Sequence, residues 1–429
     1  MISLRYHIVS LVAVFLALAL GIVVGSTVLQ EGTVSVLRAT SDRVREESDR
    51  NSRENVALNQ EVSRLQSFGA TVLPDLVRDR LKGRSVVLVD TDKVDSGMRG
   101  AVRKVPEDAG AQVDGQITFS DDRLALALGI VVGSTVLQEG TVSVLRATSE
   151  QVRQQSERNS RENVALKQEQ GRLQSFGATV LPELVQDRLK GRSVVLVDTD
   201  KVDSGLRDGV RKVLEDAGAR VDGQITFADD RLALGGDADR EAMARLLAVD
   251  AGDPEVLRGE FVKKLAARLA TSTALPQEDG QRASDMLTGL QDADFLADLK
   301  LSQPLASGTV PFPRQGSIFV LLGPSATATT ALAPDAFLVP LADQVSTLTG
   351  GPVAGGEAAA VPKQTSWILA LRDNRAVSRR VSGIDSVDTV YGQLALVQAL
   401  QGSLQQLPAG QYGIKDGASG LLPERTEGS

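Results

Sequence analysis

The side chains best placed to do chemistry form an acidic cluster that occurs twice in the chain. In its first occurrence the cluster comprises Asp90, Thr91, Asp92 and Asp95. In its second it comprises Asp198, Thr199, Asp200 and Asp203. Each cluster ends an apolar run, and carboxylates at the carboxyl end of a buried strand lie where α/β folds bind ligands and could hold a hard cation. The sequence offers no further ligand, so the favoured interpretation is a polar loop in which Asp203 or Ser204 caps the next helix.

Few other residues could support catalysis or metal binding. The chain has no cysteine, which excludes disulfides, thiolate metal sites and cysteine nucleophiles and suits an oxidising compartment. Its one histidine, His7, stands at the edge of an apolar run, where it could contact lipid headgroups or supply one weak metal ligand. A stable metal site needs several converging ligands, so the interfacial role is favoured. Because this histidine is the only one, Ser-His-Asp catalysis and zinc hydrolysis are disfavoured, and we expect no enzyme and no resident cofactor.

Composition limits the classes of partner. The net charge is −8 and the isoelectric point is about 5.1, so no broad basic surface is available and nucleic acid is not an expected partner. The chain has 429 residues, of which 42% are hydrophobic. This is long enough and apolar enough for two or three domains with a well-formed core.

The run at residues 8–29 is uncharged and meets the length of about 20 residues that a helix needs to cross a bilayer. Arg5 precedes it, and positive charge near a first span stays in the cytoplasm, so the rest of the chain is expected outside the membrane. A cleaved signal peptide is the alternative, but the run lacks a small-x-small cleavage site and exceeds a usual signal. Gly21 and Gly25 form a GxxxG pair that could pack two such helices together, although small residues are common in any membrane helix.

A long internal repeat dominates the first half of the chain. Residues 16–123 recur as residues 124–231, with 16 differences in 108 positions, so that 108 − 16 = 92 are identical. This period and identity indicate a recent duplication or a sequence-assembly error rather than a solenoid, and a single-copy chain would have 429 − 108 = 321 residues. The second apolar run, at 124–137, is too short to span. We expect Pro106 to disrupt the helix of copy one, where copy two has Leu214, and copy two also adjoins the C-terminal half. We therefore expect copy two to complete the globular domain.

Behind the anchor, a heptad pattern predicts a coiled-coil helix. Its apolar a and d residues, with Leu37 at d, are Val34, Leu37, Val44, Leu58, Val62, Leu65 and Val72. Asn55 takes an a position and Asn51 a d position, where buried asparagine lowers stability but fixes register and strand number. We expect a weak homo-oligomer stabilised by the anchor. The alternative is a charged stalk that packs on its own globular domain.

The remaining sequence indicates an α/β fold. A strand, helix and strand are expected at 193–198, 205–217 and 220–227, and the same unit recurs at 85–119. Further strands are expected at 317–323 and 366–372, and further helices at 237–249, 255–270, 284–290 and 387–404. These elements predict a three-layer, Rossmann-like extracytoplasmic domain. Residues 349–360 are interpreted as a Gly- and Ala-rich linker, and the tail after Gly413 as poorly ordered.

The expected domain order follows from these features. It comprises a transmembrane anchor at 1–30, a coiled-coil helix at 31–82, the first-copy βαβ unit at 83–123, a truncated apolar segment with a coiled-coil helix at 124–190, the α/β domain at 191–412 and a tail at 413–429.

Several stretches together resemble one known family. They are MISLRYHIVSLVAVFLALALGIVVGS at the start, KGRSVVLVDTD, VDTVYGQLALVQAL and the ending GQYGIKDGASGLLPE. With the extra copy discounted, they resemble the actinobacterial copper transporter family of MctB-like proteins. The resemblance implies a single-span envelope protein with an extracytoplasmic α/β domain and a role in copper export or resistance.

The residues themselves add little support for copper handling. Cu(I) favours thiolate and thioether ligands, yet Met98, Met243 and Met286 are scattered and are interpreted as core residues. One helix cannot enclose a pore, so transport would need oligomers or other envelope proteins. The leading hypothesis is an anchored, non-catalytic component that assists copper efflux or homeostasis, with copper as a transported or sensed ion. The alternatives are an envelope scaffold that binds proteins or cell-wall components, and a degenerate ligand-binding or hydrolytic domain.

Overall fold

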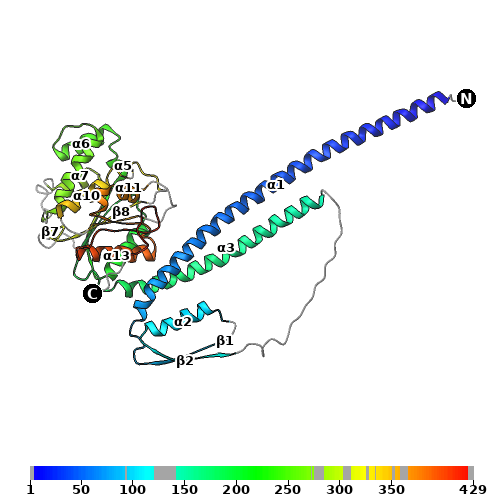
Figure 1. Ribbon diagram of the computed structural model, residues 1–429. Helices are drawn as coiled ribbons and strands as arrows, with labels where there is room; N and C mark the ends of the chain where they lie inside the picture. Colours follow the sequence, from blue (N-terminus) through cyan, green and yellow to red (C-terminus); the bar gives the residue numbers. More distant parts are fainter. Residues whose placement is uncertain are drawn as a thin grey trace. The chain divides into compact units, whose positions relative to one another are not determined.

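The computed structural model describes residues 4–91, 94–119, 142–271, 273–274, 285–302, 311–324, 328–333, 335–349, 353–357 and 366–423. The chain divides into two compact units. The first comprises Met1–Ser67, Val87–Met98 and Gly115–Leu173. The second comprises Phe68–Val86, Arg99–Asp114 and Gln174–Ser429. The architecture is mixed α/β (Figure 1).

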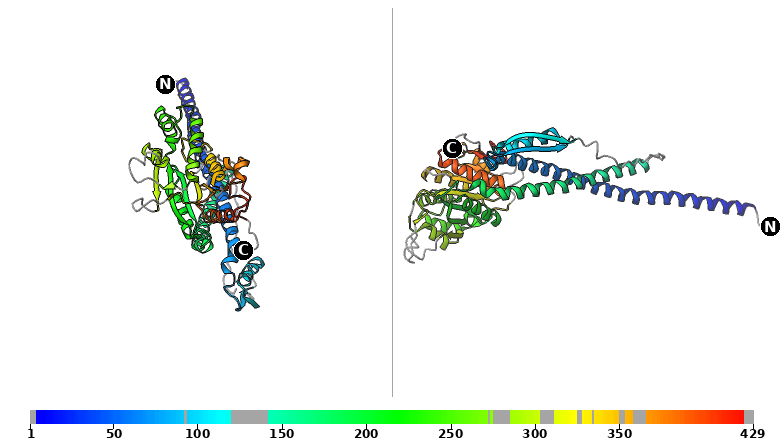
Figure 2. Two further views of the ribbon diagram at one scale, coloured as in Figure 1. Left: turned by 90° about the vertical axis from the view of Figure 1, so that its left-hand side faces the viewer. Right: turned by 90° about the horizontal axis from the view of Figure 1, so that it is seen from below.

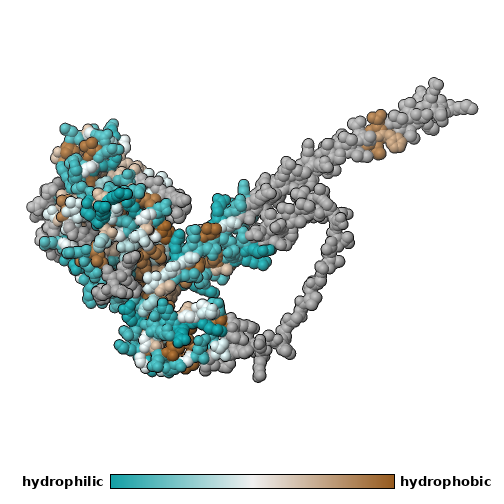
Figure 3. Space-filling view, viewed as in Figure 1, coloured by the Kyte–Doolittle hydropathy of each residue, from teal (hydrophilic) through white to brown (hydrophobic). Residues whose placement is uncertain are grey.

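Two long helices dominate the first unit. Helix α1 spans Leu4–Val77 and α3 spans Val142–Val185, so one uninterrupted helix carries both the expected anchor and the expected coil. In the apolar run, side chains are described for residues 14–18, and Phe15 and Val14 are 64% and 63% exposed. They form the apolar patch on α1 in Figure 3. Among the residues that the structure describes, no helix combines the length and the apolar character that crossing a membrane requires.

The first-copy α/β segment forms a small sheet of its own. Strands β1 (Ser85–Thr91) and β2 (Gln112–Phe119) make a two-stranded sheet, with α2 (Ser96–Asp108) between them in sequence. Helix α2 runs through Pro106, which lies in its last turn, so the expected disruption of this helix is wrong.

The second unit is built on a seven-stranded sheet. Its order is β11-β10-β9-β8-β3-β4-β6, and all pairs are parallel except β4 with β6. The strands are β3 (Ser193–Thr199), β4 (Arg220–Phe227), β6 (Leu296–Leu301), β8 (Ile318–Gly323), β9 (Val353–Glu357), β10 (Ser382–Ile384) and β11 (Gln411–Tyr412). A short antiparallel pair, β5 (Thr273–Ala274) and β7 (Pro311–Phe312), stands apart.

Helices cover both faces of this sheet (Figures 1 and 2). Those of the second unit are α4 (Ser204–Asp216), α5 (Asp229–Leu232), α6 (Asp237–Leu247), α7 (Pro254–Ala270), α9 (Met286–Asp292), α10 (Leu338–Thr349), α11 (Trp367–Asp373), α12 (Arg375–Ser378) and α13 (Val390–Leu404). Val195 and Val197 of β3 join the core beneath α6, α7 and α10. Because side chains alternate along a strand, Val194 and Leu196 face the opposite side, where α4 and α13 contact each other.

The two copies take different places, as expected. The second copy joins the C-terminal half, because β3 pairs with β8 and β4 pairs with β6. The first copy does not, although β1 and β3 share the sequence SVVLVDT. Val195 and Val197 are at most 1% exposed, whereas the equivalent Val87 and Val89 are 53% and 63% exposed. Apolar atoms accordingly reach the surface of the small sheet (Figure 3).

Three local expectations are wrong. The run expected as a strand at 366–372 is instead largely α11 (Trp367–Asp373), because Ser366 caps the helix and Trp367, Ile368 and Leu371 share one buried face. The presumed linker at 349–360 contains β9, a central strand of the sheet. The tail is folded from Gly413 as far as residue 423, and the Gly413 amide donates to the Gly420 carbonyl at 2.9 Å.

Candidate functional site

Asp198, the first carboxylate of the second-copy cluster, lies at the carboxyl end of β3 and is fully buried. Its Oδ2 accepts hydrogen bonds from Arg207 Nε at 2.5 Å and from Gln224 Nε2 at 3.1 Å. Burial raises the pKa of Asp198 above its ordinary value, and the neighbouring Arg207 and Thr226 oppose that rise. The Oδ1 atom makes no hydrogen bond. Asp198 is therefore held inside the fold by one arginine and one amide.

The other two carboxylates of the second-copy cluster, Asp200 and Asp203, have separate local partners. Asp200 accepts from the backbone N–H of Asp229 at 3.0 Å and forms an ion pair with Lys201 at 3.4 Å. Asp203 caps α4, because its Oδ1 accepts from the Leu206 N–H at 3.1 Å. The structure thus gives Asp203 the capping role expected of it. Within the described ranges, no three His, Cys, Asp or Glu side chains are grouped so that they could hold a metal ion.

The first-copy cluster repeats these local contacts. Asp90 Oδ2 accepts from Gln116 Nε2 at 2.8 Å, and Asp95 Oδ2 accepts from the Gly97 N–H at 2.8 Å. Asp92 and the side chain of Thr91 lie outside the described residues. Neither copy therefore brings its carboxylates to a common point in the part of the chain that can be described.

The remaining predicted site residues lie on α1. The side chain of His7, and the surroundings of Gly21 and Gly25, fall outside the described side chains. Asn55 is 7% exposed and Asn51 is partly buried, at the helix face that meets α3. Of the methionines, Met243 is fully buried and Met286 packs against the same core, as expected, whereas Met98 is 61% exposed and the core assignment for it is wrong.

Two buried ion pairs that no sequence motif indicated lie at the carboxyl ends of β9 and β10. Lys415 Nζ lies 2.6 Å from Glu357 Oε2, and both side chains have no exposed surface. Arg372 contacts Asp385 Oδ2 at 2.9 Å, with exposed fractions of 4% and 0%. Glu357 ends β9, Asp385 follows β10, Lys415 follows β11 and Arg372 belongs to α11. Four elements therefore bring these charges together.

These charges hold the C-terminal segment in place. Arg372 Nη1 donates to the carbonyls of Lys415 and Asp416, and its Nη2 donates to the carbonyl of Tyr412. Asp385 accepts from the Ile414 and Lys415 N–H groups at 2.7 and 3.0 Å. Burial raises the pKa of Glu357, and the ammonium of Lys415 opposes that rise. Buried charged side chains therefore hold residues 412–416 in place.

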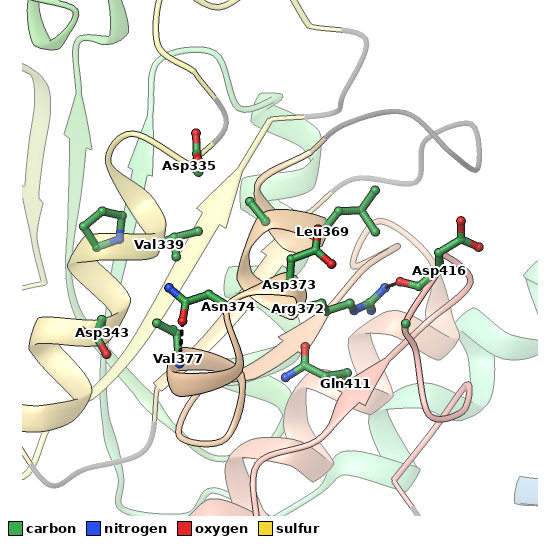
Figure 4. A pocket seen from close by; sticks show the side chains of 13 residues that line it. Asp335, Val339, Asp343, Leu369, Arg372, Asp373, Asn374, Val377, Gln411 and Asp416 are labelled. Carbon is green, nitrogen blue, oxygen red and sulfur yellow. Dashed lines mark hydrogen bonds between the residues drawn. The ribbon is translucent and has the colours of Figure 1, made fainter. Parts of the chain in front are cut away.

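A cavity of about 1120 Å³ lies beside this network (Figure 4). Arg372 contributes to its wall, so one guanidinium joins the cavity to the buried Asp385. The cavity's carboxylates come from Asp335, Asp343, Asp373 and Asp416, and Figure 4 shows them spread around it rather than converging. A second cavity, of about 470 Å³, has Arg207, Arg211, Lys300 and Asp208 among its lining residues.

One signal for the buried pairs was present in the sequence. The ending GQYGIKDGASGLLPE was among the stretches that carried the family resemblance, and it contains Lys415. A charged residue is almost never fully buried unless it is paired, but pattern alone assigns a lone lysine among glycines to an exposed turn. Its partner Glu357 lay in the segment interpreted as a linker, so the pairing could not be inferred.

Comparison with known proteins places the chain in a family. The profile of the family described as "Copper transport outer membrane protein, MctB" matches residues 1–124 and again residues 123–423. The chain belongs to the MctB family. The two matches meet at the boundary of the internal repeat, so each copy of the repeat falls in a separate match.

Curated members of the MctB family match part of the chain. "Copper transporter MctB" of Mycobacterium tuberculosis (strain ATCC 25618 / H37Rv) is 36% identical over 145 residues, which are 33% of this chain and 46% of the relative. The protein of the same name from Mycobacterium leprae (strain TN) is 39% identical over 144 residues, 33% of this chain and 45% of the relative. The matched stretch thus spans less than half the length of these relatives.

Proposed function

We propose that this MctB family protein is a membrane-anchored, non-catalytic component of the cell envelope that assists copper efflux or homeostasis. The observation that carries the proposal is the family match over residues 1–124 and 123–423, together with relatives that are named copper transporters. In this proposal copper is cargo or signal rather than a resident cofactor, because the chain has no cysteine.

The proposed anchor is the uncharged run at 8–29, with Arg5 on the cytoplasmic side and residues from 30 onward outside. Lipid is then one partner, and Gly21 with Gly25 would provide a contact between anchors of a homo-oligomer. The three-layer, Rossmann-like α/β domain would lie in the extracytoplasmic space.

Cysteine labelling tests this topology directly, because the chain has no native cysteine. Ser419→Cys in intact cells should react with a membrane-impermeant maleimide, and Ser3→Cys should react only after the membrane is permeabilised. Labelling of Ser3→Cys but not Ser419→Cys in intact cells would reverse the proposed orientation.

A scaffold without direct copper handling is the second candidate. It is favoured by the lack, among described residues, of any metal-ligand group of three His, Cys, Asp or Glu. Growth on rising copper separates the two functions. A deletion strain that is sensitive to copper, and rescued by the full chain, supports copper homeostasis. A strain that grows normally on copper but has a defective envelope supports the scaffold.

A further inference from the structure

The two copies of the predicted coil contact each other inside one chain. Asn51 Nδ2 on α1 donates to Ser160 Oγ on α3 at 3.5 Å. The equivalent bond with the copies exchanged also exists, because Asn159 Nδ2 donates to Ser52 Oγ at 3.2 Å. Adding 108 to 51 and 52 gives 159 and 160, so the two bonds join equivalent positions.

A second reciprocal pair lies about one turn further along the helices. Asn55 Nδ2 donates to Glu162 Oε2 at 3.3 Å, and Asn163 Nδ2 donates to Glu54 Oε2 at 3.3 Å. The sequence separations are 107 and 109 in both pairs of bonds. Separations this close to the repeat length of 108 mean that the helices are in register, and Figure 1 shows that α1 and α3 run in the same direction. Reciprocal contacts are the mark of an isologous interface between identical surfaces.

Burial follows the heptad frame on both helices. At this interface Asn55, Asn159 and Asn163 are 6–7% exposed, although each carries a polar amide. The next residue along each helix, Val56 or Val164, is 58% or 57% exposed. Val56 and Val164 point outward while the asparagines beside them point inward, as the heptad frame requires, and further along α1 the frame's Leu58, Val62 and Leu65 are also buried. Both Asn55 Oδ1 and Asn163 Oδ1 lack a hydrogen-bond partner at this interface.

We propose that the α1–α3 pair reproduces within one chain an interface that otherwise joins two chains. The face of each coil that carries these asparagines binds a second copy of the same coil. A single-copy form of this protein therefore dimerises in parallel through residues 159–173. In the duplicated chain the face is closed intramolecularly, so the full-length protein does not dimerise through it.

The chain's lack of cysteine makes this proposal testable by disulfide formation. Full-length protein carrying Asn55→Cys and Asn163→Cys, oxidised in mild detergent, should form a disulfide within one chain. That bond should form at least about 100-fold faster than a bond between chains at micromolar concentration, because both cysteines belong to one molecule. Full-length protein with Asn55→Cys alone should form no disulfide-linked dimer. The single-copy chain, with residues 16–123 deleted and Asn163→Cys, should give a disulfide-linked dimer.

The matched control moves each cysteine by one residue to an outward position. Val56→Cys with Val164→Cys in the full chain, and Val164→Cys in the single-copy chain, should give neither product. The proposal is overturned if Asn55→Cys alone gives linked dimers of the full chain as efficiently as the double variant closes on itself. It is also overturned if the double variant forms no bond while both cysteines react with maleimide. Both of these results are measured on the full-length protein, so they decide the proposal even if the single-copy chain fails to fold.

Discussion

Replacing Lys415 by methionine should destabilise the α/β domain strongly. The change keeps the volume of the side chain but leaves Glu357, which has no exposed surface, without its cation 2.6 Å away. Removing one partner of a buried ion pair typically costs about 3–5 kcal/mol, because the remaining charge stays buried and uncompensated. An exposed pair is worth about 0–1 kcal/mol, so Lys263→Met, which breaks the exposed contact with Glu260 at 2.7 Å, is the matched control.

The loss should depend on pH with a definite sign. Burial already raises the pKa of Glu357 above its ordinary value of 4.5, and removing the ammonium removes the largest opposing influence. A carboxyl whose folded pKa lies above its unfolded pKa opposes folding increasingly as the pH rises through that interval. Lys415→Met should therefore be close to wild type near pH 4 and increasingly destabilised towards pH 7. The double change Glu357→Gln with Lys415→Met removes both charges and should recover most of the loss.

Urea unfolding of the full-length protein in detergent measures these effects. The fluorescence of Trp367, the only tryptophan, reports on the core because the residue is 2% exposed, and circular dichroism provides a second probe. Equal unfolding free energies for wild type and Lys415→Met, or a loss that does not change between pH 4 and pH 7, would refute the reasoning.

Three further substitutions test the packing. Gly323→Ala would make a methyl group overlap the indole ring of Trp367, so it should cost about 3 kcal/mol through overpacking and shift the tryptophan emission. An unchanged urea midpoint would contradict this. Val197→Ala should cost about 2–3 kcal/mol in unfolding free energy because Val197 is 1% exposed. The equivalent Val89→Ala should cost less than about 0.5 kcal/mol because Val89 is 63% exposed, and equal losses would mean that the first copy is packed as the second is.

The elements with a strong local pattern could be predicted from sequence. The run at 193–198, the helix capped by Asp203 and the strand at 220–227 all lie where the pattern predicted them, because burial on both faces selects continuous β-branched runs. The advantage of copy two also followed from its position next to the C-terminal half, since a short connection costs less entropy to close.

What the sequence could not predict depends on tertiary contacts. Strand β9 reads as a linker because its glycines have no strand propensity, yet Gly323 of β8 and Gly355 of β9 leave room for the ring of Trp367. The run at 366–372 has an apolar pattern that fits either a short strand or a helix, and the cap at Ser366 decides for the helix.

The candidate site was equally hard to predict from the sequence. The predicted carboxylates are real features of the loop after β3, but each has its own partner. The buried pairs depend on residues separated by 58 positions, Glu357 and Lys415, and on a close contact between Arg372 and Asp385. No local pattern connects such residues, because their proximity arises only when β9, β10 and β11 align in one sheet.

Cellular copper content tests the proposed function most directly. Copper per cell is measured by mass spectrometry after growth at a fixed, sublethal copper concentration, in wild type, in a strain lacking the gene and in that strain carrying the full chain. If the protein assists copper efflux, the deletion strain should contain several-fold more copper, and the full chain should restore the wild-type content. Equal copper content in all three strains would contradict the proposed role.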